Sequence, residues 1–276
     1  SAGNHAQGVA YSARIAGVQA TIVMPQTASL SKIAATKSYG AKVILHGEIY
    51  DDAFEKAQNL KNETGATFVH PYEDPLIIAG QGTLGLEIFE QVPEIETLVV
   101  PIGGGGVMSG IATVMKILKP SIKIIGVQSV QVSGIYDLFK KHPVTKPQTR
   151  ITTIADGIAV KKTSPLVFEN FISKYVDDIV TVTDDEIAEA IVFLLERSKT
   201  LAEGSGAAAW AAGLSGKIKA TGPTCFLVSG GNIDLNILAR VIQLGQIHRG
   251  GLAHISVVVP DLPGSLSRLT QVIADG

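Results

Sequence analysis

The sequence predicts an α/β protein with two open, mostly parallel sheets, each covered by helices on both faces. Short apolar runs alternate with helical patterns along almost the whole chain, which is typical of βα units and parallel sheets. Glycine or proline closes most of these segments, as expected where a helix or strand ends. The chain has 276 residues. Because one hydrophobic core stops growing near ~250–300 residues, a subdivision into units is expected.

Residues 1–73 are expected to form a small αβ unit. Its predicted elements are helices at 5–16, 31–39 and 51–64 and strands at 20–24, 42–45 and 67–69. Gly17, Gly40 and Gly65 follow the three helices, where glycine commonly ends a helix in the left-handed conformation. Since strands and helices alternate, right-handed crossovers and parallel pairing are the expected arrangement.

Residues 74–245 are expected to form a larger αβ unit of the same kind. Predicted helices lie at 76–91, from 107, at 186–197, from 205 and at 235–244, and predicted strands lie at 97–100, 123–127, 179–182 and 224–228. Asp184 is the expected N-cap of the helix at 186–197. Residues 141–153 are polar, contain two prolines and show no period, so they are predicted to be a loop.

The composition changes after residue 245. Residues 246–252 are rich in glycine and also contain histidine and arginine, and they are predicted to be a linker. A predicted strand at 253–259 and a predicted helix from Ser265 follow. A single strand and helix cannot bury an apolar face by themselves. Residues 253–276 are therefore expected to be the incomplete start of a further domain.

Composition and charge argue against several classes of protein. The chain carries 23 Lys and Arg against 25 Asp and Glu, and 46% of its residues are hydrophobic. This balance argues against nucleic-acid binding and against a disordered tail. The longest uncharged stretch, 97–115, contains Pro101 and five glycines, so it is predicted to be a turn between two elements and not a membrane span. The single cysteine, Cys225, cannot form an internal disulfide, so a cytoplasmic location is expected.

Four consecutive glycines stand between a predicted buried strand and a predicted helix: Gly103, Gly104, Gly105 and Gly106. Such a turn lets the backbone approach a ligand closely, and the amides at the helix start favour an anion such as phosphate. A tight turn without a ligand is the alternative. The spacing lacks the third glycine of a dinucleotide-binding fingerprint and the Gly-Lys-Ser/Thr of a P-loop. A small phosphorylated cofactor is therefore predicted in place of a nucleotide.

Two further polar turns are possible ligand sites. Residues 1–8, Ser-Ala-Gly-Asn-His-Ala-Gln-Gly, open a predicted helix. Ser1 or Asn4 is either a helix cap there or part of an anion site in which Asn4 is directed at a ligand oxygen. Residues 229–232, Ser-Gly-Gly-Asn, follow a predicted strand, at the end where α/β sheets bind ligands. An ordinary turn remains the alternative at both places.

Taken together and in this order, the three turns and the Ala-Glu-Gly-Ser-Gly motif at 202–206 resemble the motifs of the fold-type II pyridoxal-phosphate enzymes, specifically the threonine ammonia-lyases (threonine dehydratases). The resemblance covers residues 1–245 and implies the tryptophan synthase β-like fold. Residues 253–276, with Asp-Leu-Pro-Gly-Ser-Leu at 261–266, are similar to the first strand and helix of an ACT domain, a small ligand-sensing module.

The resemblance implies pyridoxal 5'-phosphate as the cofactor and an amino acid as the substrate. The implied reaction is deamination of L-threonine to 2-oxobutanoate and ammonia by β-elimination of water, regulated by a small-molecule effector at the ACT domain. Serine is a second expected substrate. A homodimer or homotetramer is expected, with no nucleic-acid or membrane partner. The alternatives are a serine dehydratase or racemase of the same fold, and a non-catalytic amino-acid sensor.

The resemblance also assigns roles to residues. The cofactor phosphate is expected to be held by Gly103, Gly104, Gly105, Gly106 and the Val107 amide. The substrate carboxylate is expected to be bound by backbone groups of Ser1, Ala2, Gly3, Asn4 and His5. Asn4 is expected to bond the pyridoxal 3-oxygen, and the Ser229 hydroxyl to face the pyridine nitrogen. A neutral hydroxyl gives little drive to protonate that nitrogen, which suits β-elimination over transamination. Glu203 and the turn at 155–157 are expected to line the site.

Three departures from the family pattern are visible. Racemase-like relatives have a serine acid/base where this chain has Ala2, so elimination is favoured over racemisation. Residues 128–134 lack the carboxylates of those relatives' metal site, and the histidines show no metal-ligand spacing, so no metal is expected. The Schiff-base lysine is expected upstream of Ser1, which suggests truncation at both ends of the chain. Lys32, the nearest lysine, is expected to be a solvated surface charge.

Overall fold

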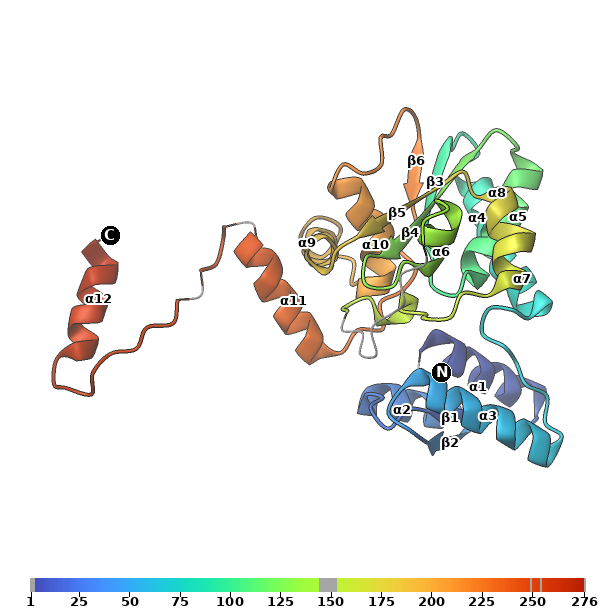
Figure 1. Ribbon diagram of the computed structural model, residues 1–276, viewed down its shortest axis with the longest axis horizontal. Coiled ribbons are helices and arrows are strands. Elements are labelled where there is room, and N and C mark those ends of the chain that lie inside the picture. Colours follow the sequence, from blue (N-terminus) through green and yellow to red (C-terminus); the bar gives the residue numbers. More distant parts are fainter. Residues whose placement is uncertain (1–2, 144–152, 249, 254, 276) are drawn as a thin grey trace.

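The computed structural model describes residues 3–143, 153–248, 250–253 and 255–275 and contains two parallel sheets (Figure 1). The small sheet pairs β1 (Thr21–Met24) with β2 (Lys42–Leu45). The large sheet has the order β5-β4-β3-β6, with β3 at Thr97–Pro101, β4 at Lys123–Ser129, β5 at Asp178–Val182 and β6 at Thr224–Phe226. All pairings between these strands are parallel. The predicted α/β class is thus confirmed.

Three helices accompany the small sheet: α1 (Asn4–Ala16), α2 (Leu30–Ser38) and α3 (Tyr50–Thr64). α1 and α3 end at Gly17 and Gly65, both in the left-handed conformation that the sequence predicts. The Ser29 hydroxyl caps α2 by accepting a hydrogen bond from the amide of Lys32 at 3.4 Å. The predicted order of helices and strands holds as far as α3.

The third strand predicted for this unit, at 67–69, is wrong. These residues are extended but pair with no strand in the described part of the chain. The Phe68 ring packs edge-on against Phe54 of α3 with 5.6 Å between centroids, and the carbonyl of Val69 accepts a hydrogen bond from Nε2 of His5 at 3.0 Å. The run is apolar because its side chains pack against helices, and not because its backbone joins a sheet.

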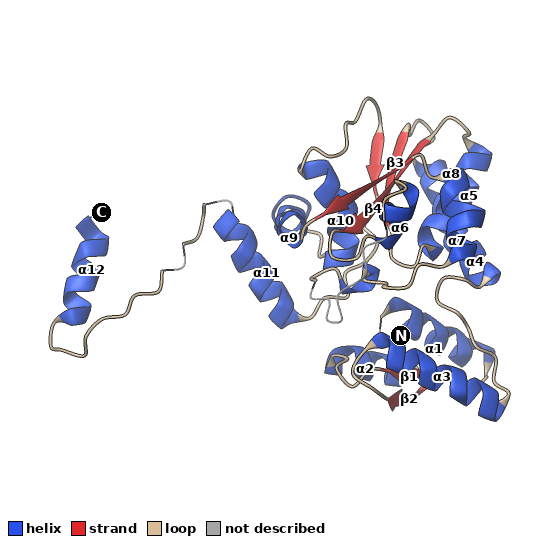
Figure 2. Ribbon diagram, in the orientation of Figure 1, coloured by secondary structure: helices blue, strands red, loops and turns tan. Residues whose placement is uncertain are grey.

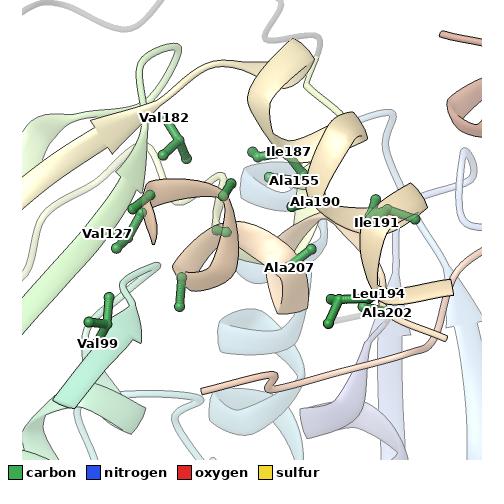
Figure 3. Close-up of a cluster of buried hydrophobic side chains, with 14 of the residues drawn as sticks. Val99, Val127, Ala155, Val182, Ile187, Ala190, Ile191, Leu194, Ala202 and Ala207 are labelled. Carbon is green, nitrogen blue, oxygen red and sulfur yellow. The ribbon is translucent and has the colours of Figure 1, made fainter. Parts of the chain in front are cut away.

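Helices cover both faces of the large sheet (Figure 2). The helices around this sheet are α4 (Pro75–Gln91), α5 (Gly106–Leu118), α6 (Gly134–Phe139), α7 (Pro165–Val167), α8 (Ser173–Tyr175), α9 (Asp184–Phe193) and α10 (Gly204–Leu214), and α11 (Leu235–His248) packs on α9. Val99 of β3 packs into a buried cluster with α9 and α10 (Figure 3). Val241 of α11 belongs to the same cluster. Its neighbours Leu98 and Val100 pack into a second cluster with α4 and α5. Burial on both faces explains why the strand is apolar throughout.

Short irregular segments connect these elements. They are the 3₁₀ turn η1 (Asp156–Ile158) and the π-helical turns η2 (Phe168–Ile172) and η3 (Leu194–Ser198). The sequence prediction contains neither α6 nor the helical stretch from α7 to α8. Most of the predicted loop at 141–153 lies outside the described residues.

Glycines let α4 and α5 pack with their backbones in direct contact. A Cβ atom on Gly110 of α5 would overlap the carbonyl oxygen of Ile78 and lie 2.6 Å from the amide nitrogen of Gly82. A Cβ atom on Gly85 would lie 3.2 Å from the carbonyl oxygen of Ile111. This close contact fixes the start of α5, where the glycine turn lies, against α4.

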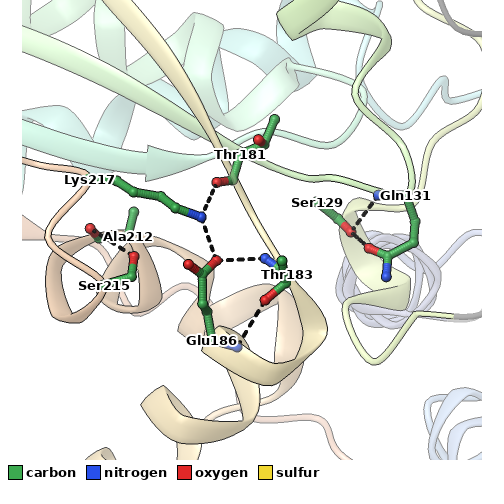
Figure 4. A network of polar contacts seen from close by, with 8 residues as sticks. All are labelled: Ser129, Gln131, Thr181, Thr183, Glu186, Ala212, Ser215 and Lys217. Carbon is green, nitrogen blue, oxygen red and sulfur yellow. Dashed lines mark hydrogen bonds and ion pairs between the residues drawn. The ribbon is translucent and has the colours of Figure 1, made fainter.

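The N-terminus of α9 differs from the prediction. Its N-cap is Thr183 and not Asp184, since Oγ1 of Thr183 accepts a hydrogen bond from the amide of Glu186 at 3.2 Å. The Glu186 carboxylate in turn accepts a hydrogen bond from the amide of Thr183 at 2.8 Å, which completes a capping box. The same carboxylate forms an ion pair with Lys217 (Figure 4). The Asp184 carboxylate instead accepts hydrogen bonds from Oγ1 of Thr153 and from the amide of Ile154.

The last segment stands away from both sheets (Figure 1). α11 continues to His248, so the linker predicted to begin at 246 starts inside this helix. The strand predicted at 253–259 is wrong for its described residues, 253 and 255–259, which form no strand. A strand needs a paired neighbour, and this segment has none in the described structure. The predicted helix from Ser265 is present as α12 (Ser265–Asp275).

No described helix is both long enough and apolar enough to cross a bilayer. Within the same residues, no three His, Cys, Asp or Glu side chains gather in a way that would hold a metal ion.

Candidate functional site

The glycine turn connects β3 to α5 at the carboxyl edge of the large sheet. Gly105 is the N-cap of α5 and has φ of 92°, a conformation that favours glycine. No side chain caps this helix, and its first turn carries no acidic residue. Amides in the first turn of a helix have no partner within the helix, so the amides that follow Gly105 are suited to an anion.

Neighbouring residues pack tightly against the turn. A Cβ atom on Gly103 would lie 3.0 Å from Cα of Ile158 and 3.2 Å from the carbonyl oxygen of Gly157, both in η1. A Cβ atom on Gly104 would overlap the ring of Tyr72. The backbone approaches its neighbours so closely that larger residues have no room. Close packing therefore explains the glycines at these positions, in addition to the predicted ligand.

The Ser-Gly-Gly-Asn turn lies at the same sheet edge. It follows β6, which pairs with β3 in parallel register, Leu98 opposite Cys225. The carbonyl of Gly230 accepts a hydrogen bond from the amide of Glu203 at 2.9 Å, which ties this turn to the start of α10. Ser229 is exposed, and Nδ2 of Asn232 is buried without a hydrogen-bond partner. The turn thus has both an exposed hydroxyl and an unused amide donor.

Glu203 joins this turn to η1. A Cβ atom on Gly230 would lie 2.5 Å from Oε1 of Glu203, and one on Gly157 would lie 3.7 Å from it. Burial raises the pKa of the Glu203 carboxyl, and the nearby Asp156 raises it further. Lys32 and a hydrogen bond from the Asn232 backbone lower the pKa in opposition. Burial and Asp156 prevail, so this carboxyl holds its proton to higher pH than an ordinary glutamate.

Ser205 is a second buried polar group in this region. It is 4% exposed, and its Oγ has no hydrogen-bond partner. A Cβ atom on Gly157 would lie 2.7 Å from this Oγ. Such an unsatisfied buried hydroxyl is unfavourable unless something binds it. The start of α10 therefore resembles that of α5 in leaving polar groups without a protein partner.

Lys32 corrects one expectation from the sequence. Its side chain is 16% exposed, and its Nζ lies 3.1 Å from Oδ2 of Asp156. The expectation that it is a solvated surface charge is wrong, because α2 turns this face toward η1. The ion pair joins the part of the chain around the small sheet to the part around the large sheet.

The start of α1 carries the remaining predicted site residues. Asn4 is its first residue and is exposed. The N-cap is Gly3, so no side-chain hydrogen bond caps the helix. His5 is held to the carbonyl of Val69, and burial lowers the pKa of its imidazole. Ser1 and Ala2 lie outside the described residues. The role of this turn therefore stays a prediction.

The structure brings most of the predicted motifs together. Contacts run from the glycine turn to η1, from η1 to Glu203, and from Glu203 to the turn at 229–232. Sequence reasoning missed the packing of Tyr72 on the glycine turn and the unpartnered hydroxyl of Ser205. The sequence near Tyr72, His-Pro-Tyr, carries no recognised ligand motif. The donors present are amides and hydroxyls, which fit a small anionic cofactor.

Comparison with known proteins decides the family. Residues 1–230 match the family model described as pyridoxal-phosphate dependent enzyme. The chain belongs to this family. Its free amides at the start of α5 and the unpartnered polar atoms of Ser205 and Asn232 fit the family's phosphorylated cofactor, pyridoxal phosphate.

Two curated proteins of similar sequence match the whole chain. The L-threonine ammonia-lyase of Thermotoga maritima is 48% identical over 276 residues, which is 100% of this chain and 68% of the relative. The L-threonine ammonia-lyase of Geobacter sulfurreducens is 46% identical over 277 residues, with the same two shares.

Solved structures confirm the predicted fold of this pyridoxal-phosphate enzyme. The processed form of threonine deaminase isoform 2 from Solanum lycopersicum superposes with a TM-score of 0.80 at 36% identity, covering 88% of this chain and 71% of that chain. Maize serine racemase also superposes with a TM-score of 0.80, at 34% identity, covering 91% of this chain and 77% of that chain.

Proposed function

We propose that this protein deaminates L-threonine to 2-oxobutanoate and ammonia with pyridoxal phosphate as its cofactor. Two relatives named L-threonine ammonia-lyase support the proposal, since they are 48% and 46% identical over the whole chain. The structural observation that carries it is the position of two turns. The glycine turn and the Ser-Gly-Gly-Asn turn follow the neighbouring parallel strands β3 and β6, so both open on one edge of the sheet.

The phosphate would be held at the start of α5. Gly103, Gly104, Gly105, Gly106 and the Val107 amide form this part of the site. The helix dipole adds to the hydrogen bonds because its positive end lies at the same place. No acidic residue in the first turn opposes an anion. The glycines allow the backbone, without side chains between, to contact the phosphate oxygens.

Other groups would orient the reacting molecules. When bound, pyridoxal phosphate supplies the electron sink that acidifies the Cα–H bond of the amino acid. Ser229, which is exposed at the end of β6, would present a neutral hydroxyl to the pyridine nitrogen. Asn4 would bond the pyridoxal 3-oxygen. The backbone of Ser1, Ala2, Gly3, Asn4 and His5 would receive the substrate carboxylate at the start of α1.

Glu203 would serve as a proton-holding group beside Ser229. Its carboxyl lies against Gly230, the residue that follows Ser229. Its raised pKa makes this carboxyl easier to protonate than an ordinary glutamate, and protonation would reduce the negative charge near the cofactor. The lysine that binds the cofactor is proposed to lie in a segment preceding Ser1, as the resemblance implies.

The finer features of the proposal concern organisation and regulation. We place the unit boundaries at residues 1–73 and 74–245, with a linker at 246–252 and a regulatory module starting at 253. The exposed apolar side chains of α12, among them Leu266 and Val272 at 70% exposure each, support the module because such a face packs against further structure. A homodimer or homotetramer in the cytoplasm is the proposed form.

A turnover assay tests the function. The protein, expressed with its preceding coding segment and supplied with pyridoxal phosphate, is given L-threonine, and 2-oxobutanoate is measured by a dehydrogenase-coupled assay. L-Serine is tested in parallel, with D-serine measured by chiral chromatography. Formation of 2-oxobutanoate is expected. Binding of threonine without turnover would instead indicate a sensor, and D-serine as the main product would indicate a racemase.

A further inference from the structure

A ladder of aromatic rings runs from α3 into the segment that connects α3 to α4. We define the aromatic ladder as Phe54, Phe68, His70 and Tyr72. Ring centroids are 5.6 Å apart between Phe54 and Phe68, 6.0 Å between Phe68 and His70, and 4.7 Å between His70 and Tyr72. All three contacts are edge-on, the geometry that aromatic pairs favour. The ladder runs from α3 beside the small sheet to the segment that enters α4.

One end of the ladder lies on the glycine turn. The side-chain ring of Tyr72 occupies the position that a Cβ atom on Gly104 would need. A Cβ atom on Gly106 would lie 2.9 Å from both Cα and Cβ of Tyr72. Tyr72 therefore covers two of the four glycines, one with its ring and the other with its backbone and Cβ.

The same segment reaches the start of α1. The carbonyl of Val69 accepts a hydrogen bond from Nε2 of His5, which directly follows Asn4. Only two residues separate Val69 from Tyr72, which packs against the glycine turn. A short stretch of chain thus contacts both of the turns that are proposed to hold the cofactor.

His70 fixes the backbone between these two contacts. Its Nδ1 accepts hydrogen bonds from the amide of Glu73 at 2.9 Å and from the amide of Tyr72 at 3.3 Å. Burial lowers the pKa of His70, which favours the neutral ring that can accept. Burial also raises the pKa of Tyr72 to about 12, so its phenol stays uncharged next to the glycine turn.

We propose that Tyr72 is a positioning residue for the cofactor phosphate: by packing on Gly104 and Gly106 it holds the glycine turn in the shape that directs its amides at the phosphate. The inference rests on the proposed function, since it assumes that the turn binds the cofactor. Tyr72 packs against Gly104 and Gly106, and its effect is exerted through the backbone amides of the turn.

Binding of two vitamin B6 compounds tests this role. Pyridoxine 5'-phosphate carries the phosphate but cannot form an imine, and pyridoxine lacks the phosphate. Tyr72→Ala is expected to weaken binding of pyridoxine 5'-phosphate on the order of tenfold, about 1.4 kcal/mol, and to leave pyridoxine binding unchanged. Tyr72→Phe keeps the ring and is expected to bind like the original protein. Dissociation constants come from ligand fluorescence, and circular dichroism confirms folding.

Substitution of the glycines gives an independent test. Gly104→Ala is expected to weaken phosphate binding in the original protein but to add no further loss to Tyr72→Ala, because the obstructing ring is then gone. Gly106→Ala is the matched control. Its obstacle is Cα and Cβ of Tyr72, which alanine retains, so Tyr72→Ala should not relieve it. If Tyr72→Ala fails to fold, Tyr72→Leu replaces it in both comparisons.

The outcomes separate this inference from the proposed function. Equal binding of pyridoxine 5'-phosphate by the original protein and by Tyr72→Ala would overturn the role of Tyr72. The role would also be overturned if Gly104→Ala weakened the binding of pyridoxine 5'-phosphate equally in the original protein and in Tyr72→Ala. If the original protein does not prefer pyridoxine 5'-phosphate over pyridoxine, the proposed function itself fails, whatever the variants do.

Discussion

Nζ of Lys32 lies 3.1 Å from Oδ2 of Asp156, and this ion pair joins α2 beside the small sheet to η1 beside the large sheet. The lysine is 16% exposed in its side chain, whereas the aspartate is 63% exposed. Water therefore screens the pair mainly at the aspartate. Because η1 also packs on Gly103, a change in the pair acts close to the glycine turn.

Lys32→Met is expected to lower the free energy of unfolding by about 0.5–1 kcal/mol, the upper range for a partly exposed pair. Methionine keeps much of the aliphatic packing and removes the charge. Lys37→Met, at the exposed end of the same helix, is the control and should change stability by less. Urea unfolding at low and high salt measures both. A loss that is no greater for Lys32→Met than for Lys37→Met would show that the pair contributes nothing.

Glu203→Gln is expected to change how stability depends on pH. The folded pKa of Glu203 lies above its unfolded pKa because of burial and Asp156. Its contribution to stability is therefore fully present below the unfolded pKa and is lost as pH rises through the folded pKa. Glutamine has no such loss, so the variant should gain stability relative to the original protein as pH rises from the unfolded pKa of Glu203 through its higher folded pKa. A difference in stability between the variant and the original protein that does not change as pH rises would contradict the assignment.

Gly110→Ala is expected to destabilise the protein by about 2–3 kcal/mol, since overpacking of a tight contact costs this much. Its new methyl group would meet backbone atoms of Ile78 and Gly82 in α4, which cannot move aside as a side chain can. Gly80→Ala is the matched control on α4. It has open space around its Cβ position and should stabilise the helix by about 0.5–1 kcal/mol. Thermal unfolding of the two variants should shift in opposite directions.

Borohydride treatment of the 276-residue chain with pyridoxal phosphate is expected to fix the cofactor to no lysine in stoichiometric amount. The ammonium group of Lys32 is paired with Asp156, and imine formation needs a neutral amine. Peptide mass mapping after reduction provides the measurement. A single labelled lysine in this chain would contradict the proposal that the lysine precedes Ser1.

Where hydrophobic period and glycine or proline boundaries agree, the sequence predicted the elements closely. The strand predicted at 42–45 is β2 at Lys42–Leu45, and the helix predicted at 51–64 is α3 at Tyr50–Thr64. The strand predicted at 67–69, and the strand predicted at 253–259 in its described residues 253 and 255–259, are absent for one physical reason. An apolar extended run becomes a strand only where a partner pairs with its backbone, and the sequence of the run does not reveal the partner.

The same limit applies to the candidate site. The glycine turn and the Ser-Gly-Gly-Asn turn were predicted because they follow strands, and strand order brings them to one edge. Lys32 was misjudged because an amphipathic helix does not show which of its polar residues faces another part of the chain. Tyr72 was missed because its role depends on contact with Gly104, 32 positions further along the chain.

The small sheet has only two strands, β1 and β2, in the described structure, and an isolated pair of strands is marginally stable. Amide protons of β1 and β2 should therefore exchange with solvent before those of β3 and β4, which are buried on both faces. A cofactor that touches both the start of α1 and the start of α5 would slow the exchange of the β1 and β2 amides toward that of β3 and β4. The bound ligand would thus stabilise the folded form of the part of the chain around the small sheet.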